Sequence, residues 1–386
     1  MRRARGFTLI EISIAVMLLA FVMAGISQIL ITQTQASSVQ LGQRELEESG
    51  RLALLELGRA IRDAGYGIAP TAAFDFDRFA CTTPGTASSC PNGGRDRSDG
   101  PDELVVAWRD PSFSRTINAK SGAGPYTFTL TSAVGSVLKA GRIVQLLCSG
   151  AEPSSYLAVN TDTAATDTNV ILRVLTNADG YFPQAAPGDG CFATAQMFLV
   201  ERTRYYVAND PTGVPSLYRD RGRGTQELLY RGIEDVQLSY DIGQPPAGSN
   251  FATGGIAAVA APGCTDTSAD GGGVASWSFG LCQGAVGTPS QSATAPDWKN
   301  DGYDSANRYT ANPANIRNVT IWVVARATRQ SPNQTGDPVP AIANRPARAK
   351  DLFHRAVLSV SEQPQNMLSR AHFLPPIFAN GNVGGG

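Results

Sequence analysis

The stretch that decides the fold is Gly6-Phe7-Thr8-Leu9-Ile10-Glu11, which opens an apolar run from Phe7 to Ile31 with one charge, Glu11. A helix that rises about 1.5 Å per residue crosses a hydrocarbon core of about 30 Å with roughly 20 residues. We therefore predict that residues 7–31 form a membrane-spanning helix.

The residues before this run set its orientation. Arg2, Arg3 and Arg5 form a short basic leader, and the positive-inside rule keeps such an end in the cytoplasm. The rest of the chain is then expected on the far side of the membrane. A cleaved secretory signal peptide is the alternative, but it has a shorter apolar region followed by a cleavage site of small residues. Here the apolar run continues into a helical pattern without a turn signal.

Glu11 is misplaced for a simple anchor. A carboxylate inside an apolar span costs a few kcal/mol and is by default a functional candidate. The alternative is a side chain that reaches the membrane edge, since Glu11 lies only four residues into the span.

Together, the basic leader, Gly6, Phe7, the following Thr-Leu-Ile-Glu11 and the apolar run resemble the type III signal of type IV pilins and their relatives. The resemblance implies that residues 1–6 are a leader, which a prepilin peptidase removes between Gly6 and Phe7. It also implies that the same enzyme methylates the new amine of Phe7. Glu11 becomes the fifth residue of the mature chain, with a role in assembly.

The helical pattern continues beyond the membrane. Residues 32–65 contain many good helix formers and no proline, and Leu54, Leu57 and Ile61 recur at spacings of three and four. Gly65 and Gly67 supply stop signals. We predict one stem helix, with residues 7–31 as its membrane or fibre-core half and residues 32–65 as its amphipathic half.

A second resemblance concerns Glu48 to Tyr66, which carries an E-x-G-R-x-A pattern and ends in Ala-Gly-Tyr. This segment resembles the PilW family of minor type IV pilins, as do the Val-rich segment that ends at Arg326 and the late segment 353–361. The resemblance implies a subunit that helps initiate or cap a type IV pilus. The implied partners are the prepilin peptidase/methyltransferase, other minor pilins, the major pilin, the inner-membrane assembly platform and, through the stem, membrane lipid. The implied location is the inner membrane, as a single-pass protein with a periplasmic globular domain, and then a surface pilus.

Residues 70–386 are predicted as a β-rich globular domain. Segments rich in β-branched and aromatic residues, or alternating in polarity, are expected to be strands of antiparallel sheets: 102–108, 126–130, 142–148, 170–175, 197–207, 236–240, 319–325 and 355–361. The range 243–313 is dense in small residues and Pro, and we interpret it as a long loop insertion. The predicted fold class is α+β, with a long stem helix packed on a pilin-like antiparallel β domain.

Six cysteines follow the predicted span, and an even number in an exported chain indicates disulfides. Six cysteines allow fifteen connectivities. We favour pairing between sequence neighbours, because two of these pairs close short loops in segments with few other constraints. No pair has the C-x-x-C spacing of zinc or thioredoxin-like sites. The favoured pairs are Cys81 with Cys90, Cys148 with Cys191, and Cys264 with Cys282.

Two acidic clusters are weak candidates for calcium, which prefers oxygen ligands at short spacings. Neither fits the D-x-D-x-D-G loop with its distal Glu, and acidic turns are usually just solvated, so no metal or cofactor is expected. The first cluster contains Asp96, Asp99, Asp102 and Glu103, and the second contains Asp297, Asp301 and Asp304.

Charge and motifs exclude other function classes. Lys and Arg total 32 against 33 for Asp and Glu, which argues against a nucleic-acid binder that works by bulk electrostatics. The only histidines are His354 and His372, and no G-x-S-x-G, phosphate-loop or H-E-x-x-H motif is present. The chain is therefore not expected to be an enzyme.

The chain also departs from main fibre subunits. It is long, it has no Pro between Phe7 and Ala69, and its last cysteine is Cys282. Major pilins are usually far shorter, and they commonly have a Pro in the stem and a cysteine pair near the C-terminus. Three alternatives to a minor pilin stay open: a pseudopilin of a type II secretion system, an adhesin or binding module at a fibre tip, and a membrane-anchored enzyme.

Overall fold

The computed structural model describes residues 9–75, 100–147, 155–175, 182, 195–222, 225–243, 276–279, 316–330, 336–343 and 345–368. A stem helix, α1, spans Leu9–Asp63, and a short 3-10 helix, Pro70–Ala72, follows it. The strands in the first half are β1 Leu104–Ser121, β2 Tyr126–Leu130, β3 Ile143–Leu147, β4 Ser155–Val159, β5 Asn169–Arg173 and β6 Gln196–Asn209. The later elements are β7 Pro215–Asp220, β8 Gln226–Arg231, β9 Ile233–Gly243, β10 Ser276–Phe279, β11 Ile316–Arg326, β12 Arg355–Glu362 and a short helix, α4, Gln365–Leu368.

Six of the antiparallel strands close into a small barrel. Each strand pairs with the next in the order β1, β2, β5, β4, β3, β6, and β6 pairs back to β1. Apolar side chains from these strands and their loops fill the interior, among them Phe113, Phe128, Leu146 and Leu172. Closure leaves no open edge among these six strands, which protects them from pairing with other chains.

β6 is long enough to serve two parts of the molecule. Its first half belongs to the barrel, and its second half pairs with β7, which pairs with β8. A separate antiparallel sheet has the order β10-β9-β11-β12. The inward-facing positions of β9 and β11 alternate with outward ones, so that Val236, Leu238, Ile321 and Val323 contribute to one core with α1.

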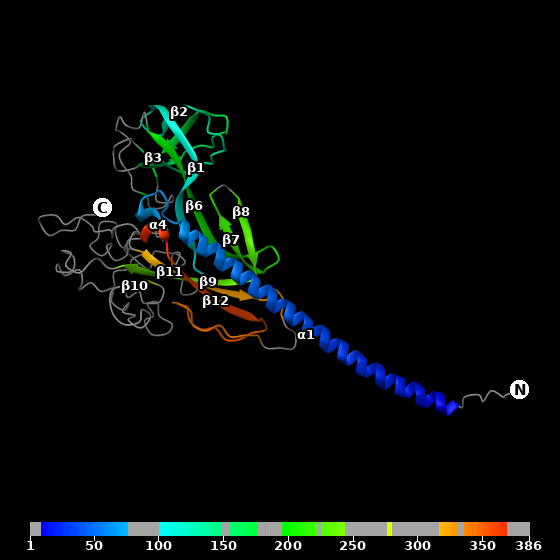
Figure 1. Cartoon of the computed structure of the whole chain (residues 1–386). Coiled ribbons are helices and arrows are strands. Elements are labelled where there is room, and N and C mark those ends of the chain that lie inside the picture. Colours follow the sequence, from blue (N-terminus) through cyan, green and yellow to red (C-terminus); the bar gives the residue numbers. More distant parts are fainter. Residues whose placement is uncertain are drawn as a thin grey trace.

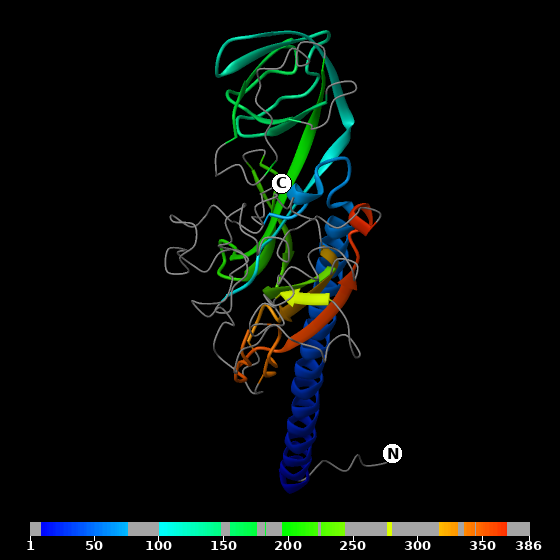
Figure 2. The same ribbon diagram turned by 90° about the vertical axis from the view of Figure 1, so that its left-hand side faces the viewer.

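The second half of α1 lies against this four-stranded sheet and also contacts β1 and β8 (Figure 1). The first half of α1 projects alone from the globular part (Figures 1 and 2). The barrel lies past the C-terminal end of α1, on the side of the molecule away from the N-terminus (Figure 2).

The predicted fold class, a long N-terminal helix followed by an antiparallel β domain, is confirmed. The expected strands all exist, but β1 was predicted to end near Trp108 and runs on to Ser121. The Asp110-Pro111 pair, which suggests a turn, instead lies where the β1–β6 register shifts. Four further strands, β4, β7, β8 and β10, were not predicted. Within the range 243–313 the structure describes Gly243 and β10, which pairs with β9, and the rest of the predicted insertion lies outside the described residues.

Candidate processing and assembly site

The expected processing site lies at the very start of the chain. Gly6 and Phe7 fall outside the described residues, and α1 begins at Leu9. Glu11 is exposed in the first turn of α1. A carboxylate there interacts favourably with the unpaired N–H groups and the positive end of the helix dipole. Helix geometry therefore reduces, but does not remove, the cost of a charge beside an apolar span.

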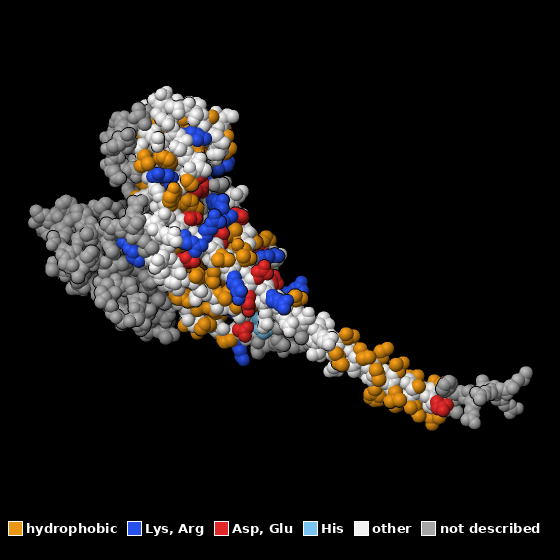
Figure 3. Space-filling view, in the orientation of Figure 1, with side chains coloured by type: hydrophobic (Ala, Val, Ile, Leu, Met, Phe, Trp, Pro, Cys, Tyr) orange, Lys and Arg blue, Asp and Glu red, His pale blue; other side chains and the backbone are white. Residues whose placement is uncertain are grey.

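The first half of α1 presents its apolar side chains outward on every face. Leu9–Thr34 is long and apolar enough to cross a membrane, with a mean hydropathy of 2.5 and none of its residues buried within the chain. Figure 3 shows this as a hydrophobic rod that extends from the globular part, with an acidic side chain near its end. An apolar surface of this size is covered by lipid or by other protein in functional molecules.

Three hydroxyl groups in this half bond to the backbone of the helix itself. The Oγ of Ser13 donates to the carbonyl of Leu9 at 3.0 Å, and the Oγ1 of Thr32 donates to the carbonyl of Gln28 at 2.9 Å. Thr34 bonds the carbonyl of Leu30 in the same way. Such bonds lower the cost of placing hydroxyls in an apolar environment, so these residues are compatible with a membrane or a bundle of stems.

In the second half of α1, small residues let a strand approach the helix. Ala53, Leu57 and Ile61 are buried against the four-stranded sheet. A Cβ added at Gly50 would lie 2.4 Å from the Cδ1 of Leu358 in β12. At position 50 the two elements are therefore so close that any side chain larger than hydrogen would require Leu358 to shift.

The end of α1 is fixed from both sides. Gly65 has a φ of +79°, as the predicted stop signal requires, and its N–H donates to the carbonyl of Ala107 at 2.9 Å. The side-chain amide of Asn366 donates to the carbonyl of Arg62 at 2.9 Å. Met367 is buried in the same core as the helix. No pattern in the sequence indicates that a residue near the C-terminus caps the stem.

A polar chain joins the end of the stem to the barrel. The Nε of Arg109 donates to the Oε1 of Gln145 at 2.9 Å, and another guanidinium nitrogen of Arg109 donates to the carbonyl of Gly67. The Nε2 of Gln145 donates to the hydroxyl of Tyr156 at 3.0 Å, and that hydroxyl accepts from the N–H of Ala69 at 2.8 Å. Gln145 and Tyr156 are buried, and a satisfied buried network of this kind holds its parts in one arrangement.

Charged side chains near the C-terminal end of α1 bind it to the β7–β8 hairpin. Glu56 accepts from the guanidinium of Arg219, which also pairs with Glu227 at 2.8 Å. The hydroxyl of Tyr205 donates to Glu56 at 3.1 Å. Burial and the nearby carboxylate of Glu56 raise the pKa of Tyr205, so this hydroxyl keeps its proton.

The remaining site candidates have separate outcomes. Asp102 accepts from the backbone N–H of Leu238 at 2.8 Å, and Glu103 pairs with Arg204 at 2.8 Å, so both have structural partners. Among the residues that the structure describes, no group of three potential ligands gathers as a metal site. The Nδ1 of His354 lies 3.1 Å from Asp337 in a half-buried loop contact. The other candidates lie outside the described residues: Cys81, Cys90, Cys148, Cys191, Cys264, Cys282, Asp96, Asp99, Asp297, Asp301, Asp304 and His372.

Comparison with known proteins identifies the start of the chain. Residues 1–27 match the family model of the prokaryotic N-terminal methylation motif. The curated proteins contain no match, and neither do the solved structures. The motif marks the chain as a type IV pilin-like protein of the prepilin-processed class, which is a structural subunit of a pilus or a pseudopilin of type II secretion. A protein of this class is processed by prepilin peptidase, anchored by its N-terminal helix and assembled with other pilins.

Proposed function

We propose that this protein is a minor pilin of the PilW type, which helps initiate or cap a type IV pilus. The observation that carries the proposal is the position of the barrel past the C-terminal end of α1 (Figure 2). Stems in such a fibre run parallel and are staggered along its axis, so a more distal subunit needs the space beyond this end of the stem. The barrel occupies that space, which favours a subunit with no neighbour above it.

The junction between stem and barrel supports the same role. Arg109, Gln145 and Tyr156 connect the barrel to Gly67 and Ala69, directly after the helix end. A barrel on a flexible linker could move aside for another subunit. One that is held through a buried hydrogen-bond network keeps its position, because breaking the network leaves buried polar groups unsatisfied.

The exposed face of the amphipathic half offers a surface for neighbouring subunits. Leu41, Leu52 and Leu55 are exposed on α1, and Leu55 is 65% exposed. Leu41 and Leu52 are 11 residues apart, close to three helical turns, and Leu52 and Leu55 are three residues apart, so the three leucines share a side of the helix. Apolar side chains along this side favour contact with another stem below the barrel.

Processing and topology complete the proposal. We infer that the peptidase cuts between Gly6 and Phe7, that the amine of Phe7 is methylated, and that Glu11 then acts in assembly. The β domain lies in the periplasm while the stem is in the inner membrane. The cysteines of the exported domain form disulfides, with the neighbour pairing as the favoured connectivity.

Deletion of the gene, with complementation by the wild type, tests the proposal. We expect the deletion to remove surface fibres and twitching motility, and we expect antibody against the β domain to label fibre ends in the complemented strain. Labelling along the whole fibre would contradict the capping role. Normal fibres with exoproteins trapped in the periplasm would favour a pseudopilin instead.

A further inference from the structure

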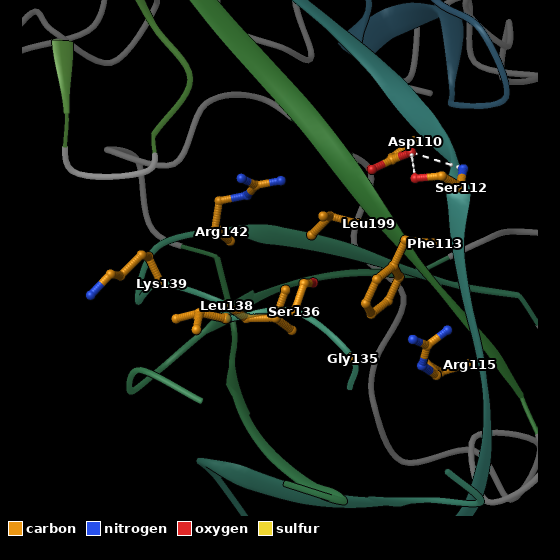
Figure 4. A pocket seen from close by; sticks show the side chains of 11 residues that line it. Asp110, Ser112, Phe113, Arg115, Gly135, Ser136, Leu138, Lys139, Arg142 and Leu199 are labelled. Carbon is orange, nitrogen blue, oxygen red and sulfur yellow. Dashed lines mark hydrogen bonds between the residues drawn. The ribbon is translucent and has the colours of Figure 1, made fainter. Parts of the chain in front are cut away.

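The mouth of the barrel holds a cavity that the fibre role does not use. Its volume is about 530 Å³, within the usual range of small-molecule sites. Phe113, Leu138 and Leu199, which belong to the barrel core, form an apolar floor. Asp110, Ser112, Arg115 and Ser136 are polar groups on the lining (Figure 4).

An irregularity in β1 brings these side chains to the cavity. Between the pairs Arg109–Val200 and Ser114–Phe198, β1 advances five residues while β6 advances two. The extra residues lie outside the regular ladder, and they include Asp110 and Phe113. Bulges at barrel rims re-aim side chains and often accompany binding sites.

Neither of the two charged groups from β1 pairs with an opposite charge in the described part of the chain, and the guanidinium of Arg115 lies over the ring of Phe113 at 5.0 Å. The Oδ1 of Asp110 accepts from the N–H and the hydroxyl of Ser112, at 2.8 and 2.6 Å, and no cation pairs with Asp110 in the described part of the chain. Arg115 donates to the carbonyls of Ala133, Ser114 and Val134, which carry no net charge. These bonds use three of its five N–H donors.

The other cations of the lining are already paired. Arg142 bonds Glu201 at 2.7 Å, and both side chains are buried. Lys139 bonds Asp162 at 2.7 Å. Asp110 and Arg115 are therefore the two charged groups of the lining that have no oppositely charged partner among the described residues. They lie on either side of Phe113 (Figure 4).

We propose that this cavity binds a short peptide with free ends, whose ammonium group meets Asp110 and whose carboxylate meets Arg115. A guanidinium recognises a carboxylate through parallel N–H donors. The apolar floor suits the chain between the two charged ends. The bonds to three carbonyls hold Arg115 beside Gly135, where an added Cβ would lie 2.5 Å from a guanidinium nitrogen of Arg115. The inference goes beyond the fibre role and does not depend on it.

Calorimetric titration of the mature full-length chain in detergent micelles tests the site. The probe is triglycine, about 10 Å long when extended. Triglycine amide lacks the carboxylate, and N-acetyltriglycine lacks the ammonium group. We expect triglycine to bind, and we expect each capped peptide to bind about tenfold or more weakly, because hydrogen bonds to charged groups are the strong ones.

Two variants assign the ends of the ligand. Arg115→Gln should abolish the preference for triglycine over its amide and leave the preference over N-acetyltriglycine. Asp110→Asn keeps an acceptor for Ser112. It should abolish the preference over N-acetyltriglycine and leave the preference over the amide. Lys120→Gln is the matched control, because Lys120 is also a cation of β1 but lies over the ring of Tyr126, at 4.8 Å. It should change neither preference.

Several results would overturn the proposal. The first is no heat of binding from millimolar triglycine, and the second is equal binding of all three peptides. The third is binding of glucuronate, a carboxylate without an ammonium group, by a site that does not discriminate among the peptides. If Arg115→Gln does not fold, Asp110→Asn alone still decides whether the ammonium end is recognised there.

Discussion

Glu11 is a single carboxylate in the first turn of an apolar stem. In a bundle of such stems the charge is costly unless a cation lies beside it. The methylated amine that we infer at Phe7 would be such a cation, and only cleavage would create it. Pairing of the two would fix the axial register of one stem against another.

Glu11→Gln isolates this electrostatic contribution, because it keeps the shape and removes the charge. We expect cleavage and methylation to persist, whereas entry into fibres should largely fail. The measurement is immunoblotting of sheared fibres beside mass spectrometry of the membrane-bound protein. Normal piliation by a cleaved and methylated Glu11→Gln protein would show that Glu11 is only a tolerated residue at the membrane edge.

Gly6 precedes the expected scissile bond. The leader must pass through the peptidase at this position without a large side chain. Gly6→Val should leave an unprocessed and unmethylated precursor in the inner membrane, as seen by mass spectrometry of the N-terminus. Gly25→Val is a matched control, because Gly25 has open space around its Cα within α1 and should not affect cleavage. A wild-type chain that starts well after Ala36 would instead indicate a secretory signal peptide.

The stem helix behaves as two different elements joined end to end. Its first half has no partner within the described chain, and its second half is held by a sheet, a hairpin and the cap from Asn366. The two halves differ in the size of their side chains as much as in their polarity. Glycines and alanines on one face bring β12 close enough for its apolar side chains to cover the helix.

Gly50→Leu tests this packing at the level of the element. The new side chain meets Leu358, so we expect the free energy of unfolding to fall by about 1–3 kcal/mol, as is usual for overpacking. Gly42→Leu is the matched control, since a Cβ there meets nothing within 4 Å. Because leucine favours a helix over glycine by up to about 1 kcal/mol, the control should be neutral or stabilising. Urea unfolding followed by circular dichroism measures both, and equal stability of the two variants would contradict the packing argument.

At the scale of the whole molecule, the relation between stem and barrel depends on few groups. The hydroxyl of Tyr156 lies between Ala69, which follows the stem, and Gln145 of the barrel. The 3-10 helix and barrel residues such as Ile143 and Val200 form an apolar cluster around it. The orientation of the barrel thus depends on this buried hydroxyl together with the bonds of Arg109 and the backbone hydrogen bonds that join the segment after the stem to β1.

Tyr156→Phe removes that hydroxyl and takes the acceptor from the buried amide of Gln145 and the partly buried N–H of Ala69. We expect a loss of about 1–3 kcal/mol in the free energy of unfolding. Tyr126→Phe is the control in the same barrel, and a partly buried tyrosine whose ring alone packs should change stability by less than about 0.5 kcal/mol. If the two variants unfold at the same urea concentration, the hydroxyl does not hold the junction.

The sequence by itself determined the features that depend on local pattern. The stem helix and its end at Gly65 follow from helical periodicity and from the positive φ that glycine permits. The prepilin motif was readable without any tertiary contact, because a peptidase reads it as a linear stretch. Strands with clear alternation or many β-branched residues, such as β9 and β11, were predicted for the same reason.

Only the tertiary structure decided how the strands close and what meets the stem. β8 is an edge strand of its sheet and carries several polar side chains, so its sequence lacks the alternation of a half-buried strand. β1 continues through Asp110-Pro111 because β6 accommodates a bulge there, although the pair alone predicts a turn. Barrel closure joins residues such as Ser114 and Phe198, and Asn366 caps a helix that ends about 300 residues earlier. Such contacts depend on which distant segments are adjacent in space, and no local pattern in the chain encodes that.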